Sequence, residues 1–422
     1  MVRPRNALRL LLIVLAGTLA LPLVVSVLAL RGPASGARAA DGGPSVIATI
    51  RTGRGGDAAR GVAANPNTNR IYVTDGSFNV SVIDGASNTV LATVEVGSNP
   101  VGVAVNPNTN RIYVANAFNN SVSVIDGADN SVVATVAVGT GLYGNGPWGV
   151  AVNPNTNLIY VTIPGSHGLS VIDGASNTVV ATVAVASNPL PVAVNPTTNL
   201  IYAANLNTSN VSVVDGASNT VVATVAVGFN PFGVAVNPST NRIYVTNSQN
   251  GNVSVIDGGS NTVVATVALG TGPTGVAVNP NTNRIYVANS NSDNVSVIDA
   301  ASNTVVATVD VGSNPVGVAV NPNTNLIYVE NSLDDVVSVI EDIVPPTPNG
   351  TFTTTPRPAT PTPPNLPGVG SKVMLPPTGI AAESGAPAGD SGWTVGAYAA
   401  LAGAAVAVAI GGWYARRRWR AG

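Results

Sequence analysis

The sequence contains no cysteine, a single histidine and few charged residues. Asp, Glu, Lys and Arg make up 9% of its 422 residues, against about a quarter in an average soluble domain. Without cysteine there is no disulfide and no thiolate metal site. One histidine excludes a cluster of histidine ligands and a Cys–His catalytic pair. The fold must therefore rest on packing, and we expect no metal and no cofactor.

The few charges are unevenly distributed. Between Asp41 and Ile343 there are 18 acidic residues and 7 arginines, so this part of the chain is acidic. Nucleic-acid binding requires a basic surface. We therefore expect no nucleic-acid partner.

The first 40 residues have the layout of a secretory signal. Arg3, Arg5 and Arg9 precede an uncharged stretch, residues 10–30, and small residues around Ala39 follow. Cleavage after Ala39 and retention as a signal anchor are both compatible with this layout. Either alternative exports the segment that follows.

The C-terminal region predicts a second membrane signal. Residues 393–414 carry no charge and are long enough to cross a bilayer as a helix. A block of arginines, residues 416–420, follows and predicts a cytoplasmic end. Upstream, residues 344–374 are rich in Pro and Thr, which is typical of an extended stalk.

Between stalk and helix lies Leu375-Pro376-Pro377-Thr378-Gly379. Together with the apolar segment and basic tail that follow, it resembles the LPxTG sorting signal of cell-wall proteins. That resemblance implies that a sortase cleaves between Thr378 and Gly379 and joins the threonine to the cell wall. We expect localisation at the cell surface, anchored to the wall or to the membrane.

Residues 41–343 consist of repeats. An Asn-Pro dipeptide recurs at intervals of 41 to 47 residues, at Asn65, Asn106, Asn153, Asn195, Asn237, Asn279 and Asn321. This period fits one four-stranded blade of a β-propeller. In the fifth unit the predicted strands are residues 233–236, 242–246, 253–256 and 262–267, each β-branched and bounded by Gly, Pro, Asn or Asp.

The two ends of the repeat array predict a closed ring. The seventh unit stops at Asp342 without a fourth strand, and residues 46–50 match the fourth-strand pattern ahead of the first unit. We predict an all-β fold, a seven-bladed β-propeller of antiparallel blades closed when the strand near Ile47 pairs with that near Val339.

The second strands carry a recognisable motif. Ile243-Tyr244-Val245-Thr246-Asn247 and its variants, such as Ile71-Tyr72-Val73-Thr74-Asp75, resemble the YVTN β-propeller repeats of bacterial and archaeal surface proteins. The resemblance covers residues 45–343. It implies the blade architecture and no particular activity.

Antiparallel pairing places the Asn-Pro and Asp-Gly turns on one face of the disc, the turn face. The remaining connections lie on the other, the loop face. The aspartates of the Asp-Gly turns (Asp84, Asp126, Asp173, Asp215, Asp257 and the corresponding Asp299) are interpreted as turn formers rather than metal ligands. The repeat tyrosines, from Tyr72 to Tyr328, are interpreted as packing between blades.

The loop face is where the units differ. It collects the aromatic and histidine residues outside the repeat pattern: Phe78, Phe118, Tyr143, Trp148, His167, Phe229 and Phe232. Exposed aromatics over a rigid scaffold are typical of binding sites. The alternative is that these side chains plug the central channel or pack loop against loop.

These features favour a non-enzymatic binding or adhesion module with an extracellular protein or glycan as its partner. The alternative is a self-associating structural component of the cell envelope. A lyase or glycosidase is the enzymatic alternative. It would use loop carboxylates such as Asp334 and Asp335 near Glu330, which we otherwise interpret as solvated loop residues.

Overall fold

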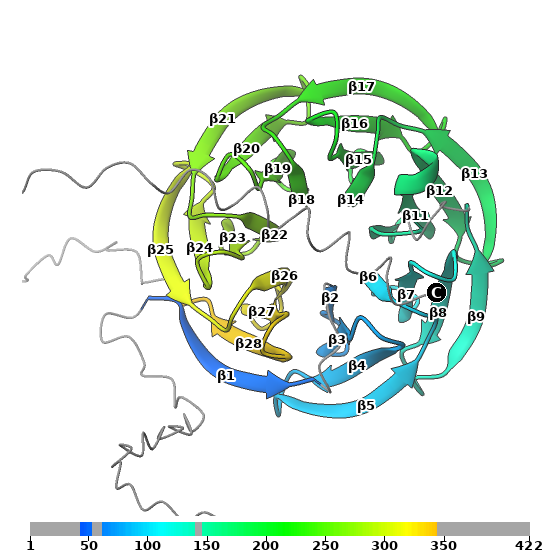
Figure 1. Ribbon diagram of the computed structural model, residues 1–422, viewed down its shortest axis with the longest axis horizontal. Helices are drawn as coiled ribbons and strands as arrows, with labels where there is room; N and C mark the ends of the chain where they lie inside the picture. Colours follow the sequence, from blue (N-terminus) through cyan, green and yellow to red (C-terminus); the bar gives the residue numbers. More distant parts are fainter. Residues whose placement is uncertain (1–42, 53–60, 140–145, 344–422) are drawn as a thin grey trace, which may run out of the picture. The chain divides into compact units, whose positions relative to one another are not determined.

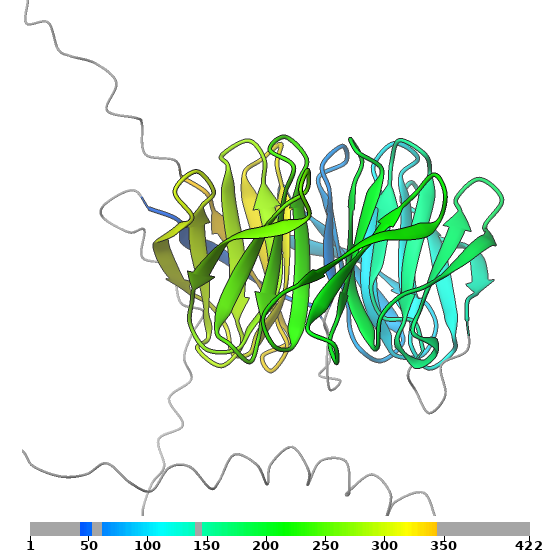
Figure 2. The same ribbon diagram turned by 90° about the horizontal axis from the view of Figure 1, so that it is seen from above.

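The computed structural model describes residues 43–52, 61–139 and 146–343, which belong to one compact unit. Their strands form seven four-stranded antiparallel sheets arranged in a ring around a central channel (Figure 1). Viewed edge-on, the ring is a disc with connections on both faces (Figure 2). The predicted seven-bladed β-propeller is confirmed.

Each blade runs from an inner strand at the channel to an outer strand at the rim. The blades are β2 (Val62–Asn65), β3 (Arg70–Thr74), β4 (Asn79–Asp84), β5 (Thr89–Glu95); β6 (Pro100–Asn106), β7 (Arg111–Asn116), β8 (Ser121–Asp126), β9 (Val132–Ala137); β10 (Val150–Asn153), β11 (Leu158–Ile163), β12 (Gly168–Asp173), β13 (Thr178–Ala184); β14 (Pro189–Asn195), β15 (Leu200–Asn205), β16 (Asn210–Asp215), β17 (Thr220–Ala226); β18 (Pro231–Asn237), β19 (Arg242–Asn247), β20 (Asn252–Asp257), β21 (Thr262–Ala268); β22 (Pro273–Asn279), β23 (Arg284–Asn289), β24 (Asn294–Asp299), β25 (Thr304–Asp310); and β26 (Pro315–Asn321), β27 (Leu326–Asn331), β28 (Val336–Glu341), β1 (Ser45–Arg51). One 3₁₀ turn, η2 (Pro164–Ser166), joins β11 to β12.

The first and last strands close the ring as predicted. β1 pairs antiparallel with β28, with Ala48 opposite Val339 and Val46 opposite Ile340. Just beyond the paired strands, Thr52 N donates to the Asp335 carbonyl at 3.1 Å. The seventh blade is therefore built from both ends of the array.

The core lies between neighbouring blades. The second-strand tyrosines are almost fully buried, and each packs against the next blade: Tyr72 joins Val103 and Ile112, and Tyr328 joins Ile71 across the closure. Burial raises the pKa of Tyr202 to about 12 because the phenolate would be poorly solvated. The interpretation of the tyrosines as packing between blades is confirmed.

A second link between blades is polar and runs around the turn face. The Asn-Pro asparagine of each blade donates its Nδ2 to the side-chain Oδ1 of the asparagine that ends the corresponding turn of the next blade. Seven such bonds of 2.7 to 3.1 Å close a circle: Asn65–Asn110, Asn106–Asn157, Asn153–Asn199, Asn195–Asn241, Asn237–Asn283, Asn279–Asn325 and Asn321–Asn69. The last bond joins blade seven to blade one, so this circle has no open end.

These positions require asparagine for two reasons. The donor Asn65 also accepts from Asn67 N through its Oδ1, so both ends of its amide are used. The acceptor Asn69 has φ 51, as its counterparts do in the other blades, and asparagine tolerates this left-handed conformation. Aspartate could not donate the bond between blades.

The end of the propeller is clamped to the sixth blade. The buried Asp342 carboxylate accepts from Arg284 Nη1 at 2.7 Å, from Thr282 Oγ1 at 2.6 Å and from Asn279 Nδ2 at 3.2 Å. Arg284 also donates to the Ile343 carbonyl at 3.1 Å. The chain thus leaves the ring from a fixed point.

The signal segment, stalk, sorting signal and predicted membrane helix, residues 1–40 and 344–422, lie outside the described residues. Within the described ranges no helix has the length and hydropathy to span a bilayer.

Arg284→Ala should destabilise the ring far more than Arg242→Ala, although both arginines begin the second strand of a blade. The Arg284–Asp342 pair is buried, with side chains 14% and 0% exposed, whereas Arg242–Asp257 is 35% and 32% exposed. We expect a loss of about 3 kcal/mol for Arg284→Ala and of less than about 1 kcal/mol for Arg242→Ala, measured by urea unfolding. Equal losses would contradict the clamp.

Candidate functional site

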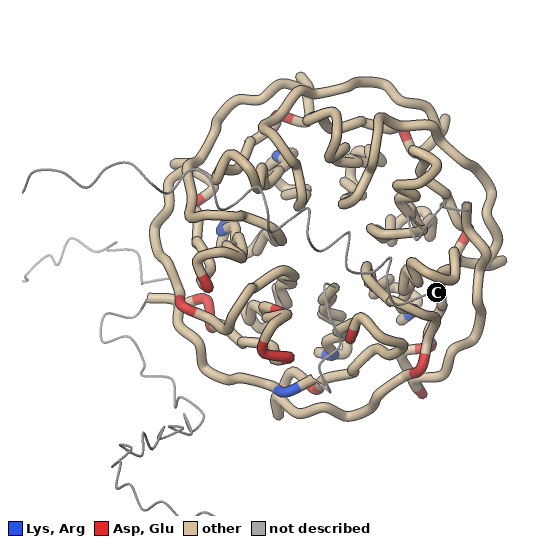
Figure 3. Tube along the Cα trace, in the orientation of Figure 1, with Lys and Arg blue, Asp and Glu red and all other residues tan. Residues whose placement is uncertain are grey.

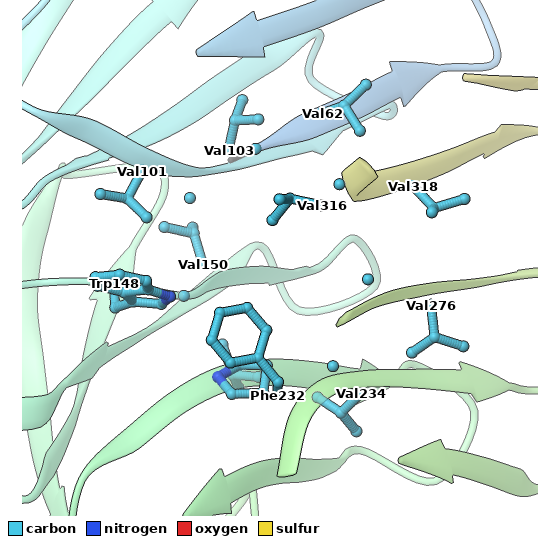
Figure 4. A pocket seen from close by; sticks show the side chains of 18 residues that line it. Val62, Val101, Val103, Trp148, Val150, Phe232, Val234, Val276, Val316 and Val318 are labelled. Atoms are coloured by element: carbon cyan, nitrogen blue, oxygen red, sulfur yellow. The ribbon is translucent and has the colours of Figure 1, made fainter. Parts of the chain in front are cut away.

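The candidate site is a cavity at the loop-face end of the channel. It has a volume of about 170 Å³ and is lined by inner-strand residues of all seven blades. Every one of its 18 lining residues is Gly, Val, Pro, Trp or Phe (Figure 4). No lining side chain carries a charge, a hydroxyl or an amide, so recognition here depends on apolar contact, on the Trp148 indole N–H and on the backbone.

Trp148 and Phe232 are the large side chains of this cavity, and the sequence had singled out both. They occupy equivalent places, each following the proline that opens an inner-strand segment Pro-x-Gly-Val. Both are partly exposed, and Figure 4 shows them at the same cavity, Trp148 from blade three and Phe232 from blade five. The Trp148 amide donates to the Thr162 carbonyl at 2.9 Å, which fixes its backbone to the neighbouring strand.

The glycine of the Pro-x-Gly-Val segment sets the width of the channel mouth. A Cβ built on Gly233 would lie 2.2 Å from the Thr274 carbonyl oxygen, and one on Gly102 would lie 2.2 Å from that of Trp148. Thr246 Oγ1 donates to the same Thr274 carbonyl at 2.6 Å. In the blades that carry this glycine, neighbouring inner strands approach too closely for a Cβ without a shift, whereas blade four has Pro191 at the equivalent position.

The other phenylalanines lie on the loop face but outside the cavity lining. Phe78, Phe118 and Phe229 are 53%, 50% and 62% exposed, in the β3–β4, β7–β8 and β17–β18 connections. Tyr143 falls outside the described residues. The structure therefore brings two of the predicted residues together in a cavity and leaves three as exposed side chains around it.

Leu333, in the β27–β28 connection, is an exposed apolar residue that the sequence reasoning missed. It is 73% exposed, more than any of these phenylalanines. It occupies the same loop position as Phe118 of blade two. Aligning the loops blade by blade would have revealed it.

His167 has a local structural role. It adopts φ 54 after η2, and its Nδ1 accepts a hydrogen bond from Asn188 N at 3.2 Å. The imidazole is exposed and does not line the cavity. The hydrogen bond fixes the connection to the next blade.

The repeat aspartates are turn formers, as interpreted. Asp84 accepts from Ala86 N and from Ser87 Oγ, both at 3.0 Å, and these hydrogen bonds hold the pKa of its carboxyl below the usual value. In the described part of the chain no group of three or more His, Cys, Asp or Glu residues could hold a metal ion.

The carboxylates considered for catalysis lie in different environments. Glu330 is not a solvated loop residue: it lies within β27 and is 1% exposed, because its place is that of the inward-facing Thr246 of blade five. Asp334 is exposed, and its Oδ2 accepts from Ser313 N at 2.6 Å.

No protein-family model and no curated protein sequence matches this chain. Among solved structures it is similar to Kuenenia stuttgartiensis hydrazine synthase, with a TM-score of 0.62 and 22% identity. The match covers 68% of this chain and 97% of that one. At this identity the likeness shows the propeller fold alone.

Gly233→Ala should destabilise the channel mouth, whereas Gly259→Ala, in an exposed turn, should not. The new methyl at 233 would collide with the Thr274 carbonyl, while at 259 the nearest atom is Asp257 Oδ1 at 3.2 Å. We expect a loss of about 2 kcal/mol for Gly233→Ala and of no more than about 0.5 kcal/mol for Gly259→Ala. Thermal unfolding measures both, and a harmless Gly233→Ala would contradict the close approach.

Proposed function

We propose that this protein is a non-enzymatic binding module held outside the cell, and that its loop-face cavity receives an apolar group of a macromolecular partner. The observation that carries the proposal is the cavity lining, which contains Trp148 and Phe232 and, apart from the Trp148 indole N–H, no polar side-chain group. A ligand group that needs several hydrogen bonds would find too few side-chain partners there, which is unfavourable.

The size of the cavity supports a single ring or branched side chain as the group bound. Its volume of about 170 Å³ is close to that of an engineered cavity of about 150 Å³ that binds benzene. Pockets for whole drug-sized ligands are larger, about 300 Å³ or more. The cavity therefore suits one anchoring side chain of a larger partner.

The location rests on the sequence. The N-terminal signal, the Pro- and Thr-rich stalk, the sorting motif at Thr378-Gly379 and the apolar residues 393–414 together favour export and attachment to the wall or membrane. The YVTN-type motif supports the same assignment, because such repeats resemble those of surface proteins. The partner would then be an extracellular protein or glycan, and the apolar lining favours a protein.

A second candidate function, self-association in the cell envelope, is favoured by the rim. In the pairing of the outermost strand of every blade a β-bulge leaves one residue unpaired. All seven are aliphatic and 44–56% exposed: Ile47, Leu91, Val133, Val180, Val222, Val264 and Val306. Bulges oppose pairing of edge strands, so contact between copies would use these side chains rather than the strand edges.

Combined Trp148→Ala and Phe232→Ala substitutions should abolish binding to the partner. Losing two partly buried aromatics at the centre of a contact reduces affinity by about 100-fold or more. Fluorescently labelled protein applied to peptide, glycan and cell panels measures this, with the exposed rim variant Leu91→Ala as control. Binding by the double variant equal to that of the unaltered protein would refute the cavity as the site.

The two candidate functions also differ in solution behaviour. A binding module should sediment as a single species over a wide concentration range, whereas an envelope lattice should show assembly that grows with concentration. If assembly occurs, Val180→Asp with Val222→Asp should abolish it, because a buried unpaired charge opposes apolar contact. Analytical ultracentrifugation decides, and assembly unaffected by these rim variants would exclude the rim.

A further inference from the structure

Closure of the ring brings together loops from opposite ends of the sequence. Blades six and seven, near residues 290–335, lie beside blades one and two, near residues 75–120 (Figure 1). We call the loop face of these four blades the acidic–apolar sector. Its composition could not be seen along the chain, because three other blades separate its two halves in the sequence.

The sector carries a concentration of carboxylates. Asp293 and Asp310 belong to blade six, Asp334 and Asp335 to blade seven, and Asp75 and Glu95 to blade one. Figure 3 marks acidic residues around β25, β28 and β5. In the described part of the loop face Arg51 is the one arginine or lysine, and blades three to five contribute no Asp, Glu, Lys or Arg.

The other arginines in the described ranges are engaged on the opposite face. Arg70, Arg111, Arg242 and Arg284 all begin second strands, at the turn-face end. Arg111 pairs with Asp126 at 2.6 Å and Arg242 with Asp257, while Arg70 Nη1 donates to the Gly127 carbonyl at 2.6 Å. They lie away from the carboxylates of the sector, whose described residues carry six acidic side chains against one arginine, Arg51.

The same sector exposes large apolar side chains. Leu333 of blade seven, Phe78 of blade one and Phe118 of blade two are 73%, 53% and 50% exposed, in three consecutive blades. Two neighbouring carboxylates are held in place by backbone amides: Asp334 by Ser313 N at 2.6 Å and Asp293 by Asn314 N at 2.8 Å. Apolar and acidic groups thus alternate on an ordered surface.

We propose that the partner of the loop face is a basic polypeptide segment, in which Arg or Lys side chains flank a bulky apolar side chain. This rests on the proposed function, because the apolar residue would occupy the Trp148–Phe232 cavity while the basic residues lie over the acidic–apolar sector. Charge complementarity selects the cation. The lining has one polar side-chain group, the Trp148 indole N–H, and therefore selects an apolar anchor rather than a sugar with many hydroxyls.

Other cationic occupants fit less well. A divalent metal needs several oxygen ligands converging on one point, and no group of three acidic residues in the described ranges meets that condition. Nucleic acid and acidic glycans would be repelled by the sector. A flexible basic peptide can follow carboxylates spread over several blades.

The test uses the purified full-length chain in mild detergent and four fluorescein-labelled peptides of one length. Their centres are Arg-Arg-Phe-Arg-Arg, Gln-Gln-Phe-Gln-Gln, Glu-Glu-Phe-Glu-Glu and Arg-Arg-Ala-Arg-Arg, in Gly-Ser flanks. Fluorescence anisotropy at low and at physiological salt should rank the basic Phe peptide first, by about 10-fold over the Gln peptide and more over the Glu peptide. The advantage should shrink with added salt.

Matched variants separate the sector from the cavity. Glu95→Gln with Asp310→Asn should reduce the preference for the basic peptide several-fold, whereas Asp129→Asn with Glu341→Gln makes the same charge change on the turn face and should leave it intact. Trp148→Ala should weaken every Phe peptide. The basic Ala peptide should bind poorly to all variants.

The outcomes distinguish the two proposals. Trp148-dependent binding of the Gln or Glu peptide with no preference for the basic one would overturn the basic partner and leave the cavity as a binding site. Equal binding of the basic Phe and Ala peptides, insensitive to Trp148→Ala, would overturn the cavity and leave only charge attraction. Failure of all four peptides to bind would overturn the basic polypeptide partner. The glycan and cell panels described above would then test separately whether the cavity is a binding site.

Discussion

The circle of asparagine hydrogen bonds on the turn face is the constraint on which the arrangement of the blades depends. Each amide caps its own turn and also reaches the next blade, so the shape of a turn and the spacing between blades are determined together. A buried amide that lost its partner would carry a full desolvation cost. Because the circle closes from Asn321 to Asn69, every blade has a partner on both sides, and neither end of the repeat array leaves such an amide unmatched.

This constraint leaves the loop face free to differ between blades. On the turn face the residues repeat because each one serves both its own blade and its neighbour. On the loop face, backbone contacts fix the spacing of the inner strands: Gly233 lies against the Thr274 carbonyl, which Thr246 also binds. The variable residue between proline and glycine, Trp148 in one blade and Thr274 in another, therefore changes the channel mouth without changing the ring.

The repeat made the fold predictable, because each strand and turn occurs in several copies. The extra strand at Ile47 could pair only with the seventh blade, which lacks a fourth strand. The site was predictable only in part. Trp148 and Phe232 stood out as rare aromatics, but their meeting in one cavity depends on the radius of the ring. Leu333 is a common residue in a loop, and it stands out only when the loops of the blades are aligned with one another. Glu330 was interpreted as a loop residue because the sequence alone does not fix where the second strand of its blade ends. The structure places it within β27.

The pairing of β1 with β28 imposes an order on the folding of the propeller. Six blades are made of consecutive hairpins and can form from neighbouring segments, but the seventh needs partners such as Thr52 and Asp335, 283 positions apart. Contacts of such long range form late, since the entropy of closing a long loop opposes them. During synthesis β1 therefore stays unpaired, with its apolar side chains exposed, until its partner strand β28 has been made.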